Sequence, residues 1–547
     1  MVKSWCLALA TASVVAGGLT ALTLVTGSTV EPGSSVQATT VQPTTLQPRA
    51  ITSLNPTLQI GIRQRFGSEE ADQVILAAPT GSLLTVTFTD AAGQTQVQRT
   101  PRITLGIVNQ GLARPELEER LILSSHKSFE SAEASARQWI ARGIPAEIAQ
   151  PQEWQVWAQR GAYTSDQIRQ IAANAQAQQI PTVRVQQQQR TQRPVLSWVH
   201  EHYRYHRTHI QVTSDAGYMQ VGEYTYAGDI RVQPNAYGTY SIVNAVPLET
   251  YLRGVVPHEI GPGAPITAIE AQAILARTYA LRNLHRFVID DYELCANTHC
   301  QVYRGLSGTI PQIDAAIQRT AGQVLAYGGD LVDAVYSSTN GGVSAAFEDI
   351  WDGDPRPYLQ PIADIADQPG QLLDLSQPGD FRAFIDQQEG FNEVGISRFF
   401  RWNSTKTLEE LSESLRQGQD FLGIPLPTWS RISGLAILSR APSGRIQELQ
   451  ITLETPQGSH AFVVEKDQVR LAFPALLSTL FELEPVMQGE SLTGYTFVGG
   501  GFGHGVGMSQ YGSYGLSRRG FTAAQILDFY YPGTSLTHLG SLSQALP

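Results

Sequence analysis

Short runs of alternating hydrophobic and polar residues occur on both sides of a central block. Between Leu58 and Ile107 the chain contains VILAAP, LLTVTFTD and RITLGIV, and between Val195 and Ile242 it contains HIQVTSD and GYMQVGEYTYAGDIRVQP. Alternation with a period of two, interrupted by Gly-containing turns, predicts β-strands. Because the pattern resumes after the central block, we expect one β-rich domain into which the block is inserted.

The central block, residues 119–186, contains two similar units. Each unit has the pattern of a strand, a helix and a second short strand. Ser128 or Ser131 is expected to cap the first helix, and Thr164 or Ser165 the second. Two such β-α-β units predict a ferredoxin-like layer of helices on a sheet.

Helical and mixed patterns follow the second β-rich stretch. Apolar residues recur at helical spacing after Pro265, which predicts a buried helix there. Gln186 to Arg193 (QQQQRTQR) is expected to be a linker. The overall fold class is predicted to be α+β, with β-rich parts at 56–118 and at 195–540. The apolar positions of the helix are Ile269, Ala273, Ala276, Ala280 and Leu284.

The first 38 residues have the pattern of a secretory leader. Lys3 precedes a long uncharged apolar stretch, and Val36-Gln37-Ala38 offers a cleavage site. We expect cleavage, with an uncleaved membrane anchor as the alternative, because about 20 apolar residues span a bilayer. Residues 39–55 are expected to be a flexible linker. The protein is therefore predicted to be exported, to the periplasm, the cell wall or the outer face of the cytoplasmic membrane.

The charge balance bears on which classes of partner the protein can bind. The formal net charge is −11, from 38 Lys and Arg against 49 Asp and Glu. No run of basic residues occurs, so we expect no nucleic-acid interface. Contact with a membrane is expected only through the N-terminal segment, if that segment is not removed.

Five blocks of sequence stand out between residues 195 and 535. They read PLETYLRGVVPHE, EAQAILARTYAL, CANTHCQVY, SSTNGG and GGGFGHGVGMSQYGSYGL. In this order they resemble the catalytic domain of the stage II sporulation protein D family, which the amidase-enhancer proteins share. The resemblance excludes a divergent segment at about 370–490, to which we assign no role.

The resemblance implies a lytic transglycosylase that acts on peptide-free glycan, with Glu259 as its acid and base. One carboxyl group suffices for a lytic cut, because the sugar's own 6-hydroxyl replaces water as the nucleophile. Glu259 follows Val255-Val256 and precedes a Gly/Pro loop, so we expect it at the end of an apolar element beside an opening. Such a setting raises the pKa of a carboxyl. From the residue alone, an exposed glutamate before a turn is the competing interpretation.

Arg277 lies among small residues in ALARTYA, where a charge needs a partner. We expect it to orient Glu259 or the sugar, with a structural ion pair as the alternative. Asp349, Asp352 and Asp354 around Trp351 are reserve carboxylates for a hydrolytic mechanism, or a turn rich in Asp and Gly.

Two polar and glycine-rich segments are expected to line the sugar cleft. The Gly499–Gly507 segment is too glycine-dense for a buried strand and permits close approach of backbone to a ligand. Tight turns with capped polar groups are the alternative. The expected substrate-binding residues, which rest mostly on the resemblance, are Ser338, Thr339, Asn340, His504, Gln510 and Tyr511.

Cys295, His299 and Cys300 follow a C-x3-HC pattern. Family members with this pattern bind zinc through it, so the resemblance implies a structural zinc beside the cleft. Zinc prefers four tetrahedral ligands in structural sites, and His285 is the candidate fourth, with His258 as the alternative. A Cys295–Cys300 disulfide is the competing prediction for an exported protein. The chemistry itself is expected to need no cofactor.

The predicted partners are peptidoglycan glycan strands and, in the competing hypothesis, a cell-wall amidase that the protein stimulates without catalysis of its own. Residues 119–186 resemble a SPOR domain, a module that binds glycan stripped of its peptide stems. An inserted structural unit without a ligand is the alternative. If the block only binds glycan, its deletion is expected to weaken binding while sparing cleavage of short glycans.

Overall fold

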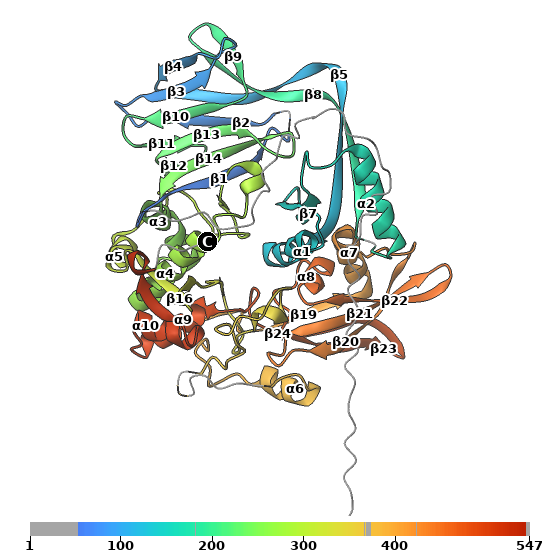
Figure 1. Cartoon of the computed structure of the whole chain (residues 1–547). Helices are drawn as coiled ribbons and strands as arrows, with labels where there is room; N and C mark the ends of the chain where they lie inside the picture. Colours follow the sequence, from blue (N-terminus) through green and yellow to red (C-terminus); the bar gives the residue numbers. More distant parts are fainter. Residues whose placement is uncertain are drawn as a thin grey trace, which may run out of the picture.

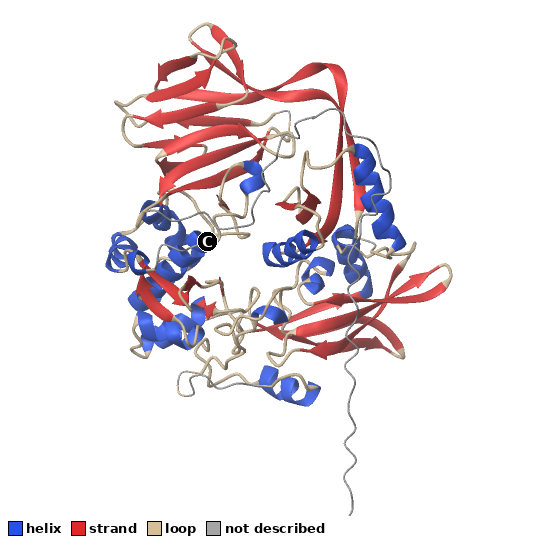
Figure 2. Ribbon diagram, in the orientation of Figure 1, coloured by secondary structure: helices blue, strands red, loops and turns tan. Residues whose placement is uncertain are grey.

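The computed structural model describes residues 53–69, 71–180, 182–365, 367, 374–422 and 424–542. The fold is mixed, with β-rich sheets and separate helical layers (Figure 2), which confirms the α+β class. The predicted leader, residues 1–38, and most of the 39–55 linker lie outside the described residues. Within the described ranges, no helix is both long and apolar enough to cross a membrane.

Strands from before and after the central block pair with each other in the β-rich part at the top of Figure 1. All neighbouring pairs in the first sheet are antiparallel except β15 with β1. Alternate residues face the core, such as Leu84, Val86 and Phe88 on one strand. The strand order is β15 (Leu294–Cys295), β1 (Thr57–Phe66), β14 (Tyr240–Pro247), β13 (Asp229–Pro234), β10 (Ile210–Ser214), β3 (Leu84–Thr89), β4 (Thr95–Thr100).

A second sheet runs from the β-rich part into the central block. Its main path is β12 (Tyr224–Ala227), β11 (Tyr218–Val221), β2 (Gln73–Ala77), β5 (Arg102–His126), β7 (Trp154–Ala158), β6 (Ala146–Ala149). β8 (Arg184–His200) pairs with β5 and with β9 (Tyr203–Arg207).

The prediction of a linker at 186–193 was wrong. These residues belong to β8 and pair with residues 110–120 of β5. Arg190 forms an ion pair with Glu118 at 2.8 Å, and Gln187 donates to Glu119 at 2.6 Å. Cross-strand polar pairs of this kind stabilise a two-sided polar ribbon. The Gln-rich residues lack an apolar face because this part of the two-stranded ribbon is mostly exposed.

Two helices accompany the strands of the central block. α1 (Phe129–Ala141) is capped by Ser128 and α2 (Ser165–Ala177) by Thr164, each the first of the two predicted alternatives. The strands lie in the order β8, β5, β7, β6, and every neighbouring pair is antiparallel. α1 covers this sheet with Phe129, Ala132, Ala136 and Trp139.

A helical layer lies below the first sheet. It contains α3 (Leu248–Glu259), α4 (Ile266–Arg282), α5 (Pro311–Arg319), α9 (Gln510–Arg518) and α10 (Ala523–Tyr530). α4 is the predicted buried helix and is apolar nearly all round, as a helix enclosed on every side must be. Two small sheets accompany it, β17 (Asp330–Leu331), β16 (Gln323–Tyr327) and β26 (Ser535–His538) in one, and β18 (Tyr336–Ser337) and β25 (Met508–Ser509) in the other.

The segment at 370–490, to which the sequence assigned no role, contributes most of a unit with its own core. Leu411, Leu415, Ile451 and Phe497 share that core. Its elements are α6 (Pro378–Asp386), β19 (Arg401–Thr407), α7 (Leu408–Gly418), β20 (Arg431–Arg440), β21 (Ile446–Thr455), β22 (Gly458–Glu465), α8 (Gln468–Ala472), β23 (Phe481–Gln488) and β24 (Ser491–Gly500).

Candidate active site

Glu259 is the last residue of α3, where the sequence predicts the end of an apolar element. Leu252, Val255 and Val256 of the same helix are fully buried, and Glu259 itself stays partly exposed. The backbone dipoles of the helix also place a partial negative charge at its C-terminal end. An apolar wall and a partial negative charge both disfavour an ionised carboxylate.

The carboxyl of Glu259 has few hydrogen-bond donors. The Val302 N–H donates to Oε1 at 2.6 Å, and the side chains of Gln510 and Tyr336 also hydrogen-bond the group. Burial raises the pKa of Glu259 to about 7, although these three hydrogen bonds act in the opposite direction. The group is therefore divided between its acid and base forms near neutral pH, as a group that both donates and accepts a proton requires.

Tyrosine and glutamine side chains that sequence reasoning missed surround this carboxyl. Gln301 accepts a hydrogen bond from the Tyr251 hydroxyl at 3.2 Å and donates to the Tyr336 hydroxyl at 3.0 Å. Burial and the neighbouring Glu259 hold the pKa of Tyr336 well above its ordinary value, so its hydroxyl stays a donor. A signal was available in the sequence, because Tyr336 directly precedes SSTNGG and Gln301 directly follows Cys300.

The SSTNGG and GGGFGHGVGMSQ segments meet at this site. β18 pairs in parallel with β25, with Tyr336 opposite Met508 and Ser337 opposite Ser509. Gln510 begins α9 because Ser509 caps that helix. Gln510 is nearly buried, and its Nε2 donates to Oε1 of Gln272 at 3.3 Å. Of the six predicted substrate-binding residues, Gln510 is the one that hydrogen-bonds Glu259.

Thr339 and Asn340 do not line a cleft, contrary to the prediction. Both are fully buried. They bind the buried carboxylate of Glu393, through the Thr339 hydroxyl and through the Asn340 N–H at 2.9 Å. Glu393 lies in the 370–490 segment, 54 residues from Thr339, and no sequence pattern connects it with these residues. Polar residues of a glycine-rich turn here satisfy a protein carboxylate.

Ser338, Tyr511 and His504 keep partial exposure. The Tyr511 N–H donates to the Ser338 carbonyl at 3.1 Å, and the Tyr511 ring lies 5.3 Å from the ring of Tyr514. Tyr514 in turn donates its hydroxyl to the carbonyl of Ile260, next to Glu259. Tyr514 therefore contacts the backbone at the end of α3, and Tyr511 packs against Tyr514.

His504 packs against Trp351, with ring centroids 4.9 Å apart. Its Nδ1 accepts the Val506 N–H at 3.0 Å, and burial lowers its pKa to about 3. The ring is neutral at physiological pH. Asp349, one of the reserve carboxylates, is buried and accepts the Ser443 hydroxyl, which removes it as a candidate for a second catalytic group.

Arg277 has a structural role, which corrects the expectation that it orients Glu259 or the sugar. It forms a two-pronged ion pair with Glu249, at 2.7 and 2.8 Å, and donates to three backbone carbonyls at 3.1 to 3.5 Å. A guanidinium has five N–H donors, so none is left for Glu259. Arg277 is fully buried. The ion pair ties the first turn of α3 to the middle of α4 and so fixes the helix that carries Glu259.

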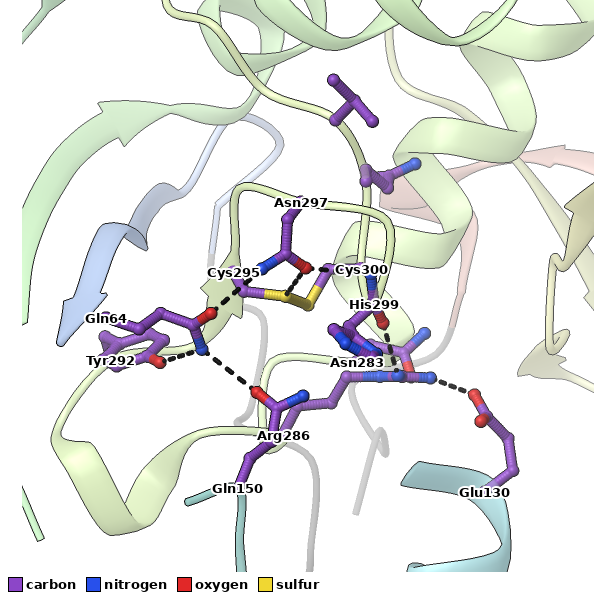
Figure 3. The surroundings of a disulfide bond; sticks show 12 residues. Gln64, Glu130, Gln150, Asn283, Arg286, Tyr292, Cys295, Asn297, His299 and Cys300 are labelled. Carbon is purple, nitrogen blue, oxygen red and sulfur yellow. Dashed lines mark hydrogen bonds and ion pairs between the residues drawn. A yellow bond between two sulfur atoms is a disulfide. The ribbon is translucent and has the colours of Figure 1, made fainter. Parts of the chain in front are cut away.

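Cys295 and Cys300 form a disulfide, with Cα atoms 5.6 Å apart (Figure 3). The loop between them is closed further by Asn297, which accepts the His299 N–H at 2.9 Å. Arg286 donates to the His299 carbonyl at 3.1 Å. This loop leads directly into Gln301 and Val302, the residues that reach the site of Glu259.

The four predicted zinc ligands do not fit a zinc ion in this arrangement. Both thiols are used by the disulfide, and the Nε2 atom of His285 pairs with Glu133 at 2.8 Å. His258, the alternative fourth ligand, is bonded through Nε2 to the Ser307 carbonyl at 2.8 Å. No group of three or more His, Cys, Asp and Glu residues within the described ranges is arranged to hold a metal. The structure has the disulfide that was the competing prediction.

The part of the chain that holds this site is similar to known proteins. Residues 236–327, which hold Glu259 and the disulfide loop, match the family model "Stage II sporulation protein". An amidase enhancer of Bacillus subtilis is 28% identical over 301 residues, covering 52% of this chain and 40% of the enhancer. A stage II sporulation protein D of the same organism is 25% identical over 335 residues, covering 57% of this chain and 81% of that protein. Over these residues the chain is similar to the stage II sporulation protein D family.

Two further matches show which other parts of the chain are shared with known proteins. An uncharacterised protein of Brachyspira hyodysenteriae is 26% identical over 303 residues, covering 54% of this chain and 68% of that protein. Residues 345–507 match a domain of unknown function (DUF8618), which includes the whole 370–490 segment that carries Glu393. The match to the amidase enhancer spans less than half of the enhancer's own length.

Proposed function

We propose that the chain is an exported lytic transglycosylase that cleaves peptide-free glycan strands of peptidoglycan. The cut separates MurNAc from GlcNAc and leaves 1,6-anhydro-MurNAc ends. The observation that carries the proposal is the pKa of Glu259, raised to about 7 by burial at a partly exposed position. The likeness to this family agrees with a role at the cell wall.

Each step uses the one carboxyl. Protonated Glu259 gives its proton to the glycosidic oxygen as the bond from that oxygen to C1 of MurNAc breaks. The carboxylate then accepts the proton of the MurNAc 6-hydroxyl as that oxygen bonds to C1 and closes the anhydro ring. The proton count balances, and no water is consumed. Gln510 and Tyr336 hold the carboxyl in place through both steps, and the Val302 N–H stabilises its charged form.

A second function is favoured by one specific finding, the likeness to an amidase enhancer. In that case the protein binds peptidoglycan and stimulates a partner amidase without cutting glycan itself. A partly exposed carboxyl with a raised pKa would then have no chemical use. The two functions differ in whether purified protein alone forms product.

We also propose that residues 119–186 form a ferredoxin-like, SPOR-like unit that binds peptide-free glycan. The strand order β8, β5, β7, β6 with α1 and α2 as connections supports the ferredoxin-like part of this proposal. The contacts of α1 revise the deletion experiment, because Glu130 pairs with Arg286 and the Ser131 hydroxyl accepts the Asp352 N–H at 3.0 Å. Deleting the block is now expected to damage cleavage as well as binding.

The test incubates purified protein with denuded glycan and analyses the products by mass spectrometry. Anhydro-muramyl ends support the transglycosylase, and reducing muramyl ends would indicate a hydrolase instead. If no product forms until an amidase and intact peptidoglycan are added, the enhancer hypothesis replaces the first. Binding to sacculi with no product under either condition contradicts both.

A further inference from the structure

A pocket of about 290 Å³ lies where the central block meets the helical layer. One wall is α1 of the central block, the second is the end of α4 with the residues that follow it, and the third is the loop from Asp333 to Arg356. Glu259 does not line it. Val335 lines the pocket, and the next residue in the sequence, Tyr336, hydrogen-bonds Glu259. Adjacent residues therefore contact the pocket and the candidate active site.

The pocket is a built feature, because its walls are bonded to one another. Figure 3 shows Glu130 of α1 reaching Arg286, which follows α4. The next turn of α1 repeats this contact, with Glu133 2.8 Å from His285. These three side chains Glu130, Glu133 and Arg286 are mostly buried, so the wall does not depend on exposed surface charges.

One end of the pocket has an excess of positive charge. Arg282 and Arg356 both pair with the same carboxylate, Asp333, at 3.3 and 2.5 Å. Glu133 also acts on both guanidinium groups, but it pairs with Arg137 as well, so two carboxylates face three guanidinium groups. The Arg356 guanidinium also lies over the ring of Phe347 at 4.4 Å, which holds it in a fixed orientation. This end can therefore accept a carboxylate in a prepared geometry.

An unpaired negative charge lies on the rim beside Arg356, since the Arg356 Nη1 donates to the Asp354 carbonyl at 2.5 Å. Asp352 pairs with Lys466 at 3.2 Å, whereas the exposed Asp354 has no ion-pair partner within the described ranges. Arg137 of α1, which also lines the pocket, forms an ion pair with Glu133 at 3.0 Å. A small pocket with one uncompensated charge of each sign is complementary to a ligand that carries both signs.

We propose that this pocket binds a compact zwitterion, an α-amino acid or the end of a short peptide. Its carboxylate contacts Arg282 and Arg356, and its ammonium contacts Asp354. Phe129 and Phe347 supply apolar surface for the carbon atoms between the two charges. Binding does not depend on Glu259 being catalytic, so this proposal and the proposed function fail separately.

The experiment titrates the full chain, as secreted, with the dipeptide Ala-Ala by isothermal calorimetry. N-acetyl-Ala-Ala lacks the ammonium and Ala-Ala amide lacks the carboxylate, while both keep the shape of the backbone. We expect the zwitterion to bind and each blocked peptide to bind at least about tenfold more weakly, because each has lost a charge-assisted hydrogen bond. Binding that is equal for all three peptides, or absent for all three, overturns the proposal.

Variants locate the site. Asp354→Asn is expected to weaken Ala-Ala binding about tenfold without altering the fold, because the side chain is exposed and has no ion pair. Asp528→Asn, an exposed aspartate on α10 that does not line the pocket, is the matched control and is expected to bind normally. Arg282→Lys keeps the positive charge but removes the planar guanidinium, so it tests the proposed contact with the ligand's carboxylate. Unchanged binding in both pocket variants contradicts the assignment.

Discussion

Two glutamates near the candidate active site differ in their exposure to solvent and in the hydrogen-bond donors around them. Glu259 ends a helix, stays partly exposed and has three donors around it. Glu393 is fully buried and accepts hydrogen bonds from the Thr339 and Ser509 hydroxyls and from two backbone N–H groups. Burial raises the pKa of both carboxyls.

The difference separates a reactive group from a structural one. A carboxylate with four donors and no access to solvent has no free lone pair to offer a substrate, and it joins the segments that surround it. A carboxyl with access to solvent and an apolar wall can exchange its proton. The glycine-rich motifs serve both groups, since Tyr336 and Gln510 reach Glu259 while Thr339 and Ser509 reach Glu393.

The largest effect on stability is expected for Glu393→Gln. Each carboxylate oxygen of Glu393 faces one backbone N–H, at 2.9 and 3.2 Å, so the new amide group must point its own N–H toward a donor whichever way it turns. We expect a loss of about 4 kcal/mol in the free energy of unfolding, measured by chemical denaturation. Glu389→Gln, an exposed neighbour, is the control with no expected change. A stable Glu393→Gln protein would remove the structural half of the comparison.

Arg277→Met is expected to cost about 3 kcal/mol, because it leaves the Glu249 carboxylate without its buried partner. The folded fraction should keep its rate of glycan cleavage, since Arg277 has no donor left for the site. Denaturation curves and rates normalised to folded protein check this together. Normal stability with lost activity would restore the earlier expectation of an active-site role.

Glu259→Gln is expected to raise stability at alkaline pH. The carboxyl has a pKa of about 7 in the folded protein and an ordinary value near 4.5 when unfolded. Below pH 4.5 both states are protonated and the substitution gains nothing; above pH 7 the wild-type fold carries a charge that burial disfavours. We expect a gain of about 2 kcal/mol at pH 9 and none at pH 4. Thermal melts across this range measure it, and a gain that is independent of pH would contradict the raised pKa.

The smallest effect is expected for the disulfide. Replacing Cys295 and Cys300 by Ser opens a short loop, so the cost is about 1.5 kcal/mol. The oxidised protein should contain no stoichiometric zinc by elemental analysis and should keep its melting temperature in a chelator. One zinc per chain in protein purified under reducing conditions would support the ligand set implied by the family resemblance.

Local patterns predicted much of this molecule because local physics decides those parts. Helix caps at Ser128 and Thr164, the buried helix after Pro265 and the place of Glu259 all follow from residues close to one another in sequence. Long-range partners were not predictable. Glu249 lies 28 residues from Arg277, and Glu393 lies 54 from Thr339. A single sequence shows that a buried charge needs a partner but does not identify that partner.

The most direct test of the central claim is the rate at which Glu259→Gln forms anhydro-muramyl ends from denuded glycan, measured beside wild type and Glu389→Gln at pH 6. We expect a loss of at least about a hundredfold for Glu259→Gln, with a melting temperature no lower than that of wild type, because the amide variant can keep the fold but cannot donate the proton. A wild-type rate in the Glu259→Gln protein would contradict the claim that this carboxyl carries the chemistry.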